Sequence, residues 1–119
     1  MLDSGGTKKI LFISPHVDDA VLGCGGTIAR LSDAGHDIYH LCFSFSRKSI
    51  PRNFSEDTTE AECIESLESL GLSRDKMLFF DYETRCFDRF RQKILEDLYK
   101  FNKTVSPEVV FLTSTKDLH

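Results

Sequence analysis

Four short β-rich runs alternate with three segments of helical periodicity, and this alternation limits the folds open to the 119-residue chain. The expected strands are residues 8–14, 37–45, 76–81 and 109–112. The expected helices are residues 20–34, 58–70 and 88–103, and Gly35 and Gly71 are the expected stops of the first two. Strands that are separated by helices favour a parallel sheet built from right-handed crossovers. We therefore predict an α/β fold with a mostly parallel sheet.

The fourth expected strand is followed by only seven residues, 113–119. A doubly wound sheet needs at least one further strand and helix to cover its edge, so we expect the domain to be truncated after strand four. Residues 1–7 are expected to form a flexible lead-in, and residues 8–119 the N-terminal portion of one domain.

Composition and charge exclude several classes of protein. Lys and Arg number 15 and Asp and Glu 19, and the formal net charge of −4 argues against a nucleic-acid surface. No stretch approaches the roughly 20 apolar residues of a membrane span, and no secretory signal is visible. The four cysteines are widely spaced and form no C-x-x-C pair, which is typical of reduced thiols. We therefore predict a cytoplasmic protein with no nucleic-acid partner and no membrane span.

A histidine and two adjacent carboxylates follow the first expected strand, in the run Ser14-Pro15-His16-Val17-Asp18-Asp19. Ligands bind at the carboxyl ends of strands in open α/β sheets, and His and Asp side chains hold Zn²⁺ or a similar divalent cation. Because His16 and Asp19 are three residues apart, one tight turn can aim both at the same cation. Asp18 then remains to take a proton from an activated water and return it to a leaving amine.

The same residues also allow a purely structural interpretation. Asp18 or Asp19 can cap the following helix, with His16 as an incidental loop residue. For His36 and His40, surface or packing roles are favoured over metal binding.

A glycine cluster, Gly23-Cys24-Gly25-Gly26-Thr27, lies inside the first expected helix. A dinucleotide-binding fingerprint begins directly at the strand-to-helix turn, whereas Gly23 comes nine residues after Ser14. Glycine lowers helix stability, so the cluster needs a reason. We interpret it as a close approach of the backbone to a strand or a ligand, and not as a nucleotide site.

Residues 14–31 closely resemble the opening motif of the LmbE-like, or PIG-L, zinc-dependent N-deacetylases. The run Ala34-Gly35-His36-Asp37, the helix end at 62–71 and the run 107–111 are also similar to that family. The resemblance implies a Rossmann-like, three-layer αβα domain. It also implies a metal-dependent hydrolase that removes an acetyl group from a small N-acetyl amino-sugar conjugate of the N-acetylglucosamine type.

The resemblance further implies roles for individual residues. His16 and Asp19 match the two zinc ligands of the family's first motif, and Asp18 matches its general base. A second family motif holds two histidines three residues apart. His119 matches the first of them, which stabilises the oxyanion, so the third zinc ligand would fall three residues beyond His119.

The chain departs from the family pattern at three positions. Val17 and Ala20 replace a usual proline and a frequent glutamate, and neither change removes a ligand. Thr59 stands where relatives often carry an arginine that helps to hold the substrate. The substrate-binding residues are therefore unassigned.

Two other classes of function stay open. The chain can be a non-catalytic or truncated family member, because the third ligand is not among its residues. It can also be a receiver-type phosphoacceptor module, with Asp18 and Asp19 after strand one, Asp81 after strand three, and Thr113 or Ser114 after strand four. A homo-oligomer is compatible with each of these functions.

Overall fold

The computed structural model describes residues 6–16, 19–44, 52–54, 58–83 and 86–114 of the chain. The four strands are β1 (Lys9–His16), β2 (Asp37–Ser44), β3 (Met77–Phe79) and β4 (Val109–Phe111). The three helices are α1 (Asp19–Asp33), α2 (Thr58–Ser69) and α3 (Arg91–Val105). Two 3₁₀ turns, Arg74–Lys76 and Phe87–Phe90, precede β3 and α3.

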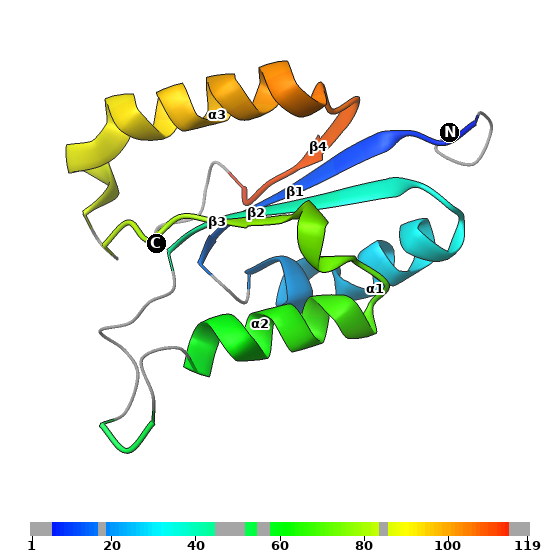
Figure 1. Ribbon diagram of the computed structural model, residues 1–119, viewed down its shortest axis with the longest axis horizontal. Coiled ribbons are helices and arrows are strands. Elements are labelled where there is room, and N and C mark those ends of the chain that lie inside the picture. The colour runs from blue at the N-terminus through cyan, green and yellow to red at the C-terminus, as the bar shows by residue number, and fades with distance from the viewer. Residues whose placement is uncertain (1–5, 17–18, 45–51, 55–57, 84–85, 115–119) are drawn as a thin grey trace.

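The strands form one parallel sheet in the order β3-β2-β1-β4. Helices α1 and α2 cover one face of the sheet and α3 covers the other, which gives three layers (Figure 1). The predicted Rossmann-like αβα architecture with a parallel sheet is therefore confirmed. β1 lies in the interior of the sheet, so its carboxyl end meets the carboxyl ends of both neighbours.

This strand order rules out the receiver-type alternative. A receiver-type sheet has the order 2-1-3-4-5, in which the first strand lies between the second and the third. Here β1 lies between β2 and β4, and β3 is on the far side of β2. The carboxylate that follows β3 is thus separated from the end of β1 by a whole strand, and the acidic pocket of a receiver is not assembled.

β1 extends two residues further than the sequence pattern predicted. It ends at His16, which pairs with Ser44 of β2, and not at Ser14. Pro15 is accommodated because pairing with β4 stops at Phe12, so the missing amide of Pro15 breaks no ladder on that side. His16 therefore belongs to a strand with a defined register.

Alternation along the strands divides the core between the two faces of the sheet. The larger cluster lies on the α1 and α2 side and includes Ile10, Phe12, Ile28 and Leu67, each at most 1% exposed. The smaller cluster lies on the α3 side around Leu11, Leu41 and Phe43. α3 contributes only partly buried side chains to it: Ile94, Leu98 and Phe101.

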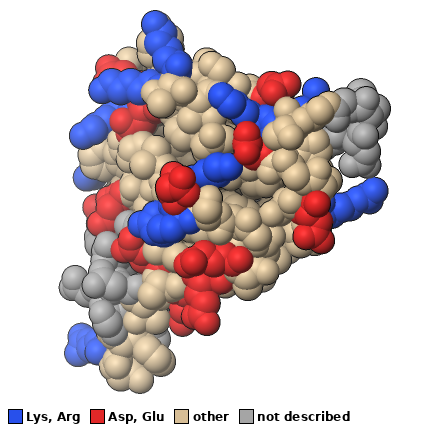
Figure 2. All heavy atoms as spheres, turned by 45° about the vertical axis from the view of Figure 1, so that its right-hand side comes forward, with Lys and Arg blue, Asp and Glu red and all other residues tan. Residues whose placement is uncertain are grey.

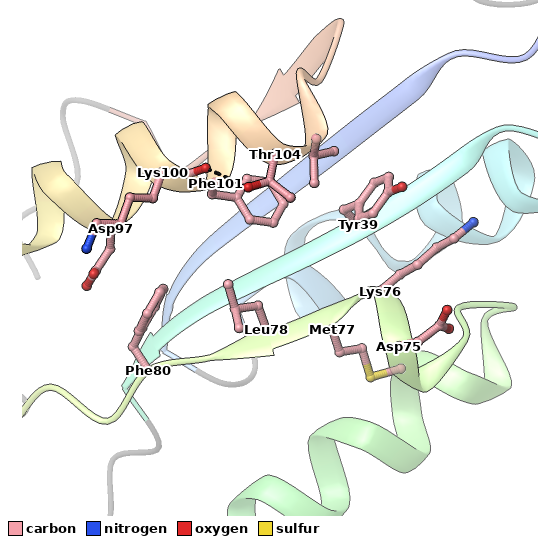
Figure 3. Close-up of a pocket in the computed structure, with 11 residues that line it drawn as sticks. Tyr39, Asp75, Lys76, Met77, Leu78, Phe80, Asp97, Lys100, Phe101 and Thr104 are labelled. Atoms are coloured by element: carbon pink, nitrogen blue, oxygen red, sulfur yellow. Dashed lines mark hydrogen bonds between the residues drawn. The ribbon is translucent and has the colours of Figure 1, made fainter.

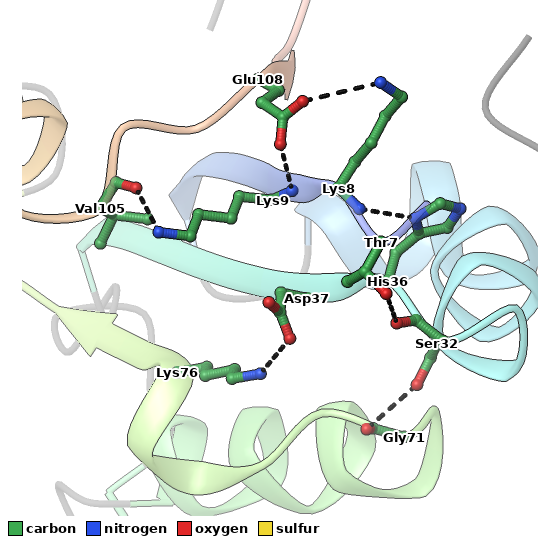
Figure 4. Close-up of polar contacts among 11 residues, drawn as sticks. Thr7, Lys8, Lys9, Ser32, His36, Asp37, Gly71, Lys76, Val105 and Glu108 are labelled. Atoms are coloured by element: carbon green, nitrogen blue, oxygen red, sulfur yellow. Dashed lines mark hydrogen bonds and ion pairs between the residues drawn. The ribbon is translucent and has the colours of Figure 1, made fainter. Parts of the chain in front are cut away.

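Gly35 and Gly71 follow α1 and α2 with φ angles of +87° and +105°, the left-handed conformation that ends many helices. The prediction that these glycines terminate the two helices is confirmed. At Gly71 the space is also limited, because a Cβ there would collide with the Ser32 side chain. The Ser32 hydroxyl donates to the Gly71 carbonyl at 3.1 Å and joins the ends of α1 and α2 (Figure 4).

Polar contacts stabilise the end of the sheet where the strands begin (Figure 4). Lys9 Nζ donates to the Val105 carbonyl at 3.2 Å, and Lys76 Nζ is 3.0 Å from Asp37 Oδ1. Thr7, in the expected lead-in, places its hydroxyl 3.3 Å from the Gly35 carbonyl oxygen, whereas residues 1–5 lie outside the described residues. These contacts fix the end of the sheet opposite to the residues that the sequence singled out.

Charged side chains of both signs are interspersed over the face shown in Figure 2. Within the described residues, that face carries no continuous basic area. In the same part of the chain, no helix combines the length and apolarity that crossing a bilayer requires. All four cysteines lie among the described residues, and none forms a disulfide.

Candidate active site

His16 and Asp19 meet at the carboxyl end of β1. His16 is the last residue of this strand and Asp19 the first of α1, so the short connection between them brings the two side chains together. The His16 backbone N–H donates to Asp19 Oδ2 at 2.9 Å, and His16 Nδ1 is 3.5 Å from the same oxygen. The two side chains are 24% and 32% exposed, which leaves them partly desolvated yet accessible from solvent.

This donor pair fits a divalent cation. Zn²⁺ bonds of about 2.1 Å in tetrahedral geometry place neighbouring ligand atoms about 3.4 Å apart. The Nδ1 to Oδ2 separation of 3.5 Å agrees with that spacing, and one imidazole with one carboxylate is a common ligand combination for zinc. Within the described residues, no group of three or more His, Cys, Asp or Glu side chains is arranged to hold a metal ion.

Two of the four predicted site residues lie outside the described residues. These are Asp18, the predicted general base, and His119, the predicted oxyanion-stabilising residue. Their roles, like the metal-binding roles of His16 and Asp19, stay predictions.

A buried serine and a buried histidine hold the start of α1 next to the His16–Asp19 pair. The sequence pattern indicated a role at the site for neither of them. Ser14 Oγ accepts the Ala20 backbone N–H at 3.1 Å, which satisfies one of the amides at the start of α1. The same oxygen is 3.0 Å from His40 Nε2 of β2. Ser14 and His40 are each 0% exposed, so this chain of contacts ties the first turn of α1, with Asp19, to two strands.

His40 is neutral at ordinary pH. Burial lowers the pKa of its imidazole from 6.5 to about 4. Its Nδ1 atom is buried and has no hydrogen-bond partner among the described residues. The expectation of a packing role for His40 fits this position, and the one sequence signal of its burial was its place in the β-rich run 37–45.

An aromatic ring lies against the imidazole of His16. Phe87, in the 3₁₀ turn before α3, has its ring centroid 5.9 Å from that of His16, with 22° between the ring planes. No sequence pattern connects these residues, because they are far apart in the chain. The contact depends on how the 3₁₀ turn before α3 packs against the α3 side of the sheet.

A small cavity of about 140 Å³ adjoins Asp19 on the α1 side of the sheet. Its lining includes Gly23 and Cys24 of α1 and Leu112 after β4. A Cβ atom at Gly23 or Gly26 would meet nothing within 4 Å, and one at Gly25 would be 3.9 Å from Leu70. The expected close approach to a strand is therefore wrong for all three glycines, and approach to a ligand stays a prediction. Gly23 lines the cavity.

A larger cavity of about 390 Å³ lies between α3 and the β2–β3 edge of the sheet (Figure 3). Tyr39, Phe80 and Phe101 form apolar walls, with Lys100 and Asp97 at the α3 side. Neither His16 nor Asp19 lines it. This cavity, although larger, is therefore separate from the strand-end residues His16 and Asp19.

The strand order defines an open parallel α/β domain, and the His16–Asp19 pair lies at the carboxyl end of β1, where ligands bind in sheets of this kind. The model of the PIG-L family, described as GlcNAc-PI de-N-acetylase, matches residues 11–119. The chain therefore belongs to the PIG-L family.

Known proteins similar to the chain include two deacetylases and a hydratase. A stretch of 34 residues is 53% identical to diacetylchitobiose deacetylase from Thermococcus kodakarensis and covers 29% of this chain and 13% of that protein. The structure of N,N'-diacetylchitobiose deacetylase from Pyrococcus horikoshii matches with a TM-score of 0.77 and 31% identity over 87% of this chain and 40% of that one. GalB, the 4-carboxy-2-hydroxymuconate hydratase from Pseudomonas putida KT2440, matches with a TM-score of 0.77 and 28% identity over 95% of this chain and 50% of its own.

The chain thus spans half or less of the length of each of these relatives. The named proteins with this fold include both deacetylases and a hydratase, so the fold does not by itself decide the reaction.

Proposed function

We propose that this chain supplies the first part of the catalytic site of a metal-dependent N-deacetylase that acts on a small N-acetyl amino-sugar conjugate. Family membership and the two deacetylase relatives support the reaction class. The observation that carries the proposal is the 3.5 Å separation between His16 Nδ1 and Asp19 Oδ2 at the carboxyl end of β1. The proposed domain is residues 8–119, and the proposed compartment is the cytoplasm.

In this proposal, His16 and Asp19 hold Zn²⁺ or another divalent cation. When bound, such a cation supplies Lewis acidity, which polarises a carbonyl oxygen and lowers the pKa of water toward 7. The His16 amide keeps one Asp19 oxygen directed toward the imidazole. Ser14 and His40 hold the first turn of α1, so the Asp19 carboxylate does not have to be ordered when the cation arrives.

The remaining roles concern proton transfer and charge. Asp18 takes a proton from the attacking water and delivers it to the nitrogen of the departing amine, so that acetate and a free amino sugar are the products. His119, in its protonated form, donates a hydrogen bond to the developing oxyanion.

The test is an Asp18→Asn variant, made in the 119-residue chain and in the longest chain that its gene encodes. Acetate release from N-acetylglucosamine conjugates is measured together with zinc content. Loss of a general base lowers the rate about 10²- to 10⁴-fold, while zinc content stays at the wild-type level. Asp33→Asn, at the exposed end of α1, is the matched control and keeps full activity.

Three outcomes would contradict parts of the proposal. Full turnover in Asp18→Asn removes the assigned base. A wild-type protein that neither binds zinc nor releases acetate identifies a non-catalytic family member. If the protein adds water to an unsaturated carboxylic acid and releases no acetate, it is a hydratase like GalB and the proposed deacetylase activity is wrong.

A further inference from the structure

Among the described residues, one aromatic contact constrains the orientation of the His16 ring. The backbone of His16 is fixed by pairing with Ser44 and by the amide hydrogen bond to Asp19. Neither contact controls rotation of the imidazole about its side-chain bonds. His16 Nδ1 and Asp19 Oδ2, at 3.5 Å, are also at the outer limit of a hydrogen bond. The aromatic ring that does contact the imidazole, among the described residues, belongs to Phe87.

Phe87 is itself held firmly. It is half-buried and packs against the cluster of Leu11, Leu41 and Phe43 on the α3 side of the sheet. The turn around it is closed by two backbone hydrogen bonds of 3.1 Å, from Cys86 to Glu83 and from Arg89 to Cys86. The Phe87 ring is thus fixed by its packing where it contacts the His16 imidazole.

The geometry of the pair matches an attractive aromatic contact. A centroid separation of 5.9 Å and an interplanar angle of 22° fall within the range of offset-stacked rings. In this arrangement Phe87 covers one face of the imidazole and leaves the ring edge, with Nδ1, directed at Asp19.

We propose that Phe87 is a positioning residue, which holds the His16 imidazole in the plane that a cation shared with Asp19 requires. The inference rests on the metal-binding function proposed above for His16 and Asp19. Without the Phe87 ring, the imidazole gains rotational freedom that cation binding must then remove, so affinity falls.

The test compares Phe87→Leu, Phe87→Tyr and a control, Phe90→Leu. Phe90 lies in the same 3₁₀ turn, but its ring contacts Tyr82 at 5.3 Å instead of His16. Zn²⁺ affinity is measured by competition with a chromophoric chelator, and the imidazole proton resonances of His16 are followed by NMR. Thermal unfolding of each variant checks the fold.

Phe87→Leu weakens Zn²⁺ binding about twofold to tenfold, which is the factor that an aromatic pair of this kind contributes. The His16 resonances also lose the ring-current shift from Phe87. Phe87→Tyr keeps the ring and restores affinity to near the wild-type value, and Phe90→Leu leaves affinity and resonances unchanged.

The opposite results separate the two proposals. Equal or tighter Zn²⁺ binding by Phe87→Leu, with displaced His16 resonances, shows that the ring only packs and overturns the inference alone. Equal losses in Phe87→Leu and Phe90→Leu assign the effect to the turn and also overturn it. A wild-type protein with no Zn²⁺ affinity overturns the metal site proposed for His16 and Asp19, and this inference with it.

Discussion

The burial of His40 makes the stability of the fold depend on pH. The imidazole is 0% exposed, its Nε2 atom is 3.0 Å from Ser14 Oγ, and burial lowers its pKa to about 4. In the unfolded chain the same group has a pKa near 6.5. Between these values the unfolded chain binds a proton that the folded chain does not bind, so acid favours unfolding.

The size of the effect follows from the two pKa values. A difference between 6.5 and about 4 corresponds to about 3 kcal/mol, at about 1.4 kcal/mol for each pKa unit. This contribution is fully present above pH 6.5 and is lost progressively as the pH falls toward 4. At pH 5, about 2 kcal/mol of it has gone.

The assay is urea unfolding of wild type and His40→Gln between pH 7.5 and 4.5. Glutamine is polar, carries a hydrogen-bonding amide and does not titrate. The difference in unfolding free energy between the two proteins therefore shrinks by about 2 kcal/mol from pH 7.5 to pH 5, because the carboxylates titrate alike in both. His36→Gln is the control; His36 is half-buried, and its Nδ1 atom accepts the Lys8 amide at 3.1 Å.

Parallel pH profiles for wild type and His40→Gln would refute the reasoning. They would mean that His40 is protonated in the folded protein, with a partner for its Nδ1 atom outside the described residues. A change of the same size in His36→Gln would assign the effect to histidines in general and not to burial.

Three further substitutions test the packing and the end of α2, and all are measured by urea unfolding. Leu67→Ala leaves a cavity at a fully buried position between α2 and the sheet and lowers the free energy of unfolding by about 2–5 kcal/mol. The control Leu95→Ala, at a position 58% exposed, changes the free energy of unfolding by less than about 0.5 kcal/mol. Equal effects would contradict the placement of Leu67 in the core. Gly71→Ala combines a left-handed backbone with a collision against Ser32 and destabilises by more than about 1 kcal/mol; a neutral result would show that the end of α2 rearranges freely.

Much of the fold was accessible from the sequence because its signals are local. Hydrophobic periodicity separated the strands from the helices, and Gly35 and Gly71 marked where two helices end. Boundaries were less accessible: the extension of β1 to His16 depends on the register with β2, which no local pattern specifies. Both Ala61 and Cys63 are small side chains of α2, but Cys63 is buried and Ala61 is exposed. Which of them faces the sheet depends on how α2 packs against it.

By itself, the sequence determined the parts of the site that lie within one turn of the chain. His16 and Asp19 meet because they are three positions apart at a strand end, and short connections leave few other arrangements. Only the tertiary structure decided which distant groups support that pair. His40 reaches Ser14 because β2 lies next to β1, and Phe87 reaches His16 because the 3₁₀ turn before α3 packs on the α3 side of the sheet. Contacts of this kind arise from the order of strands and the packing of layers, which are properties of the whole folded chain.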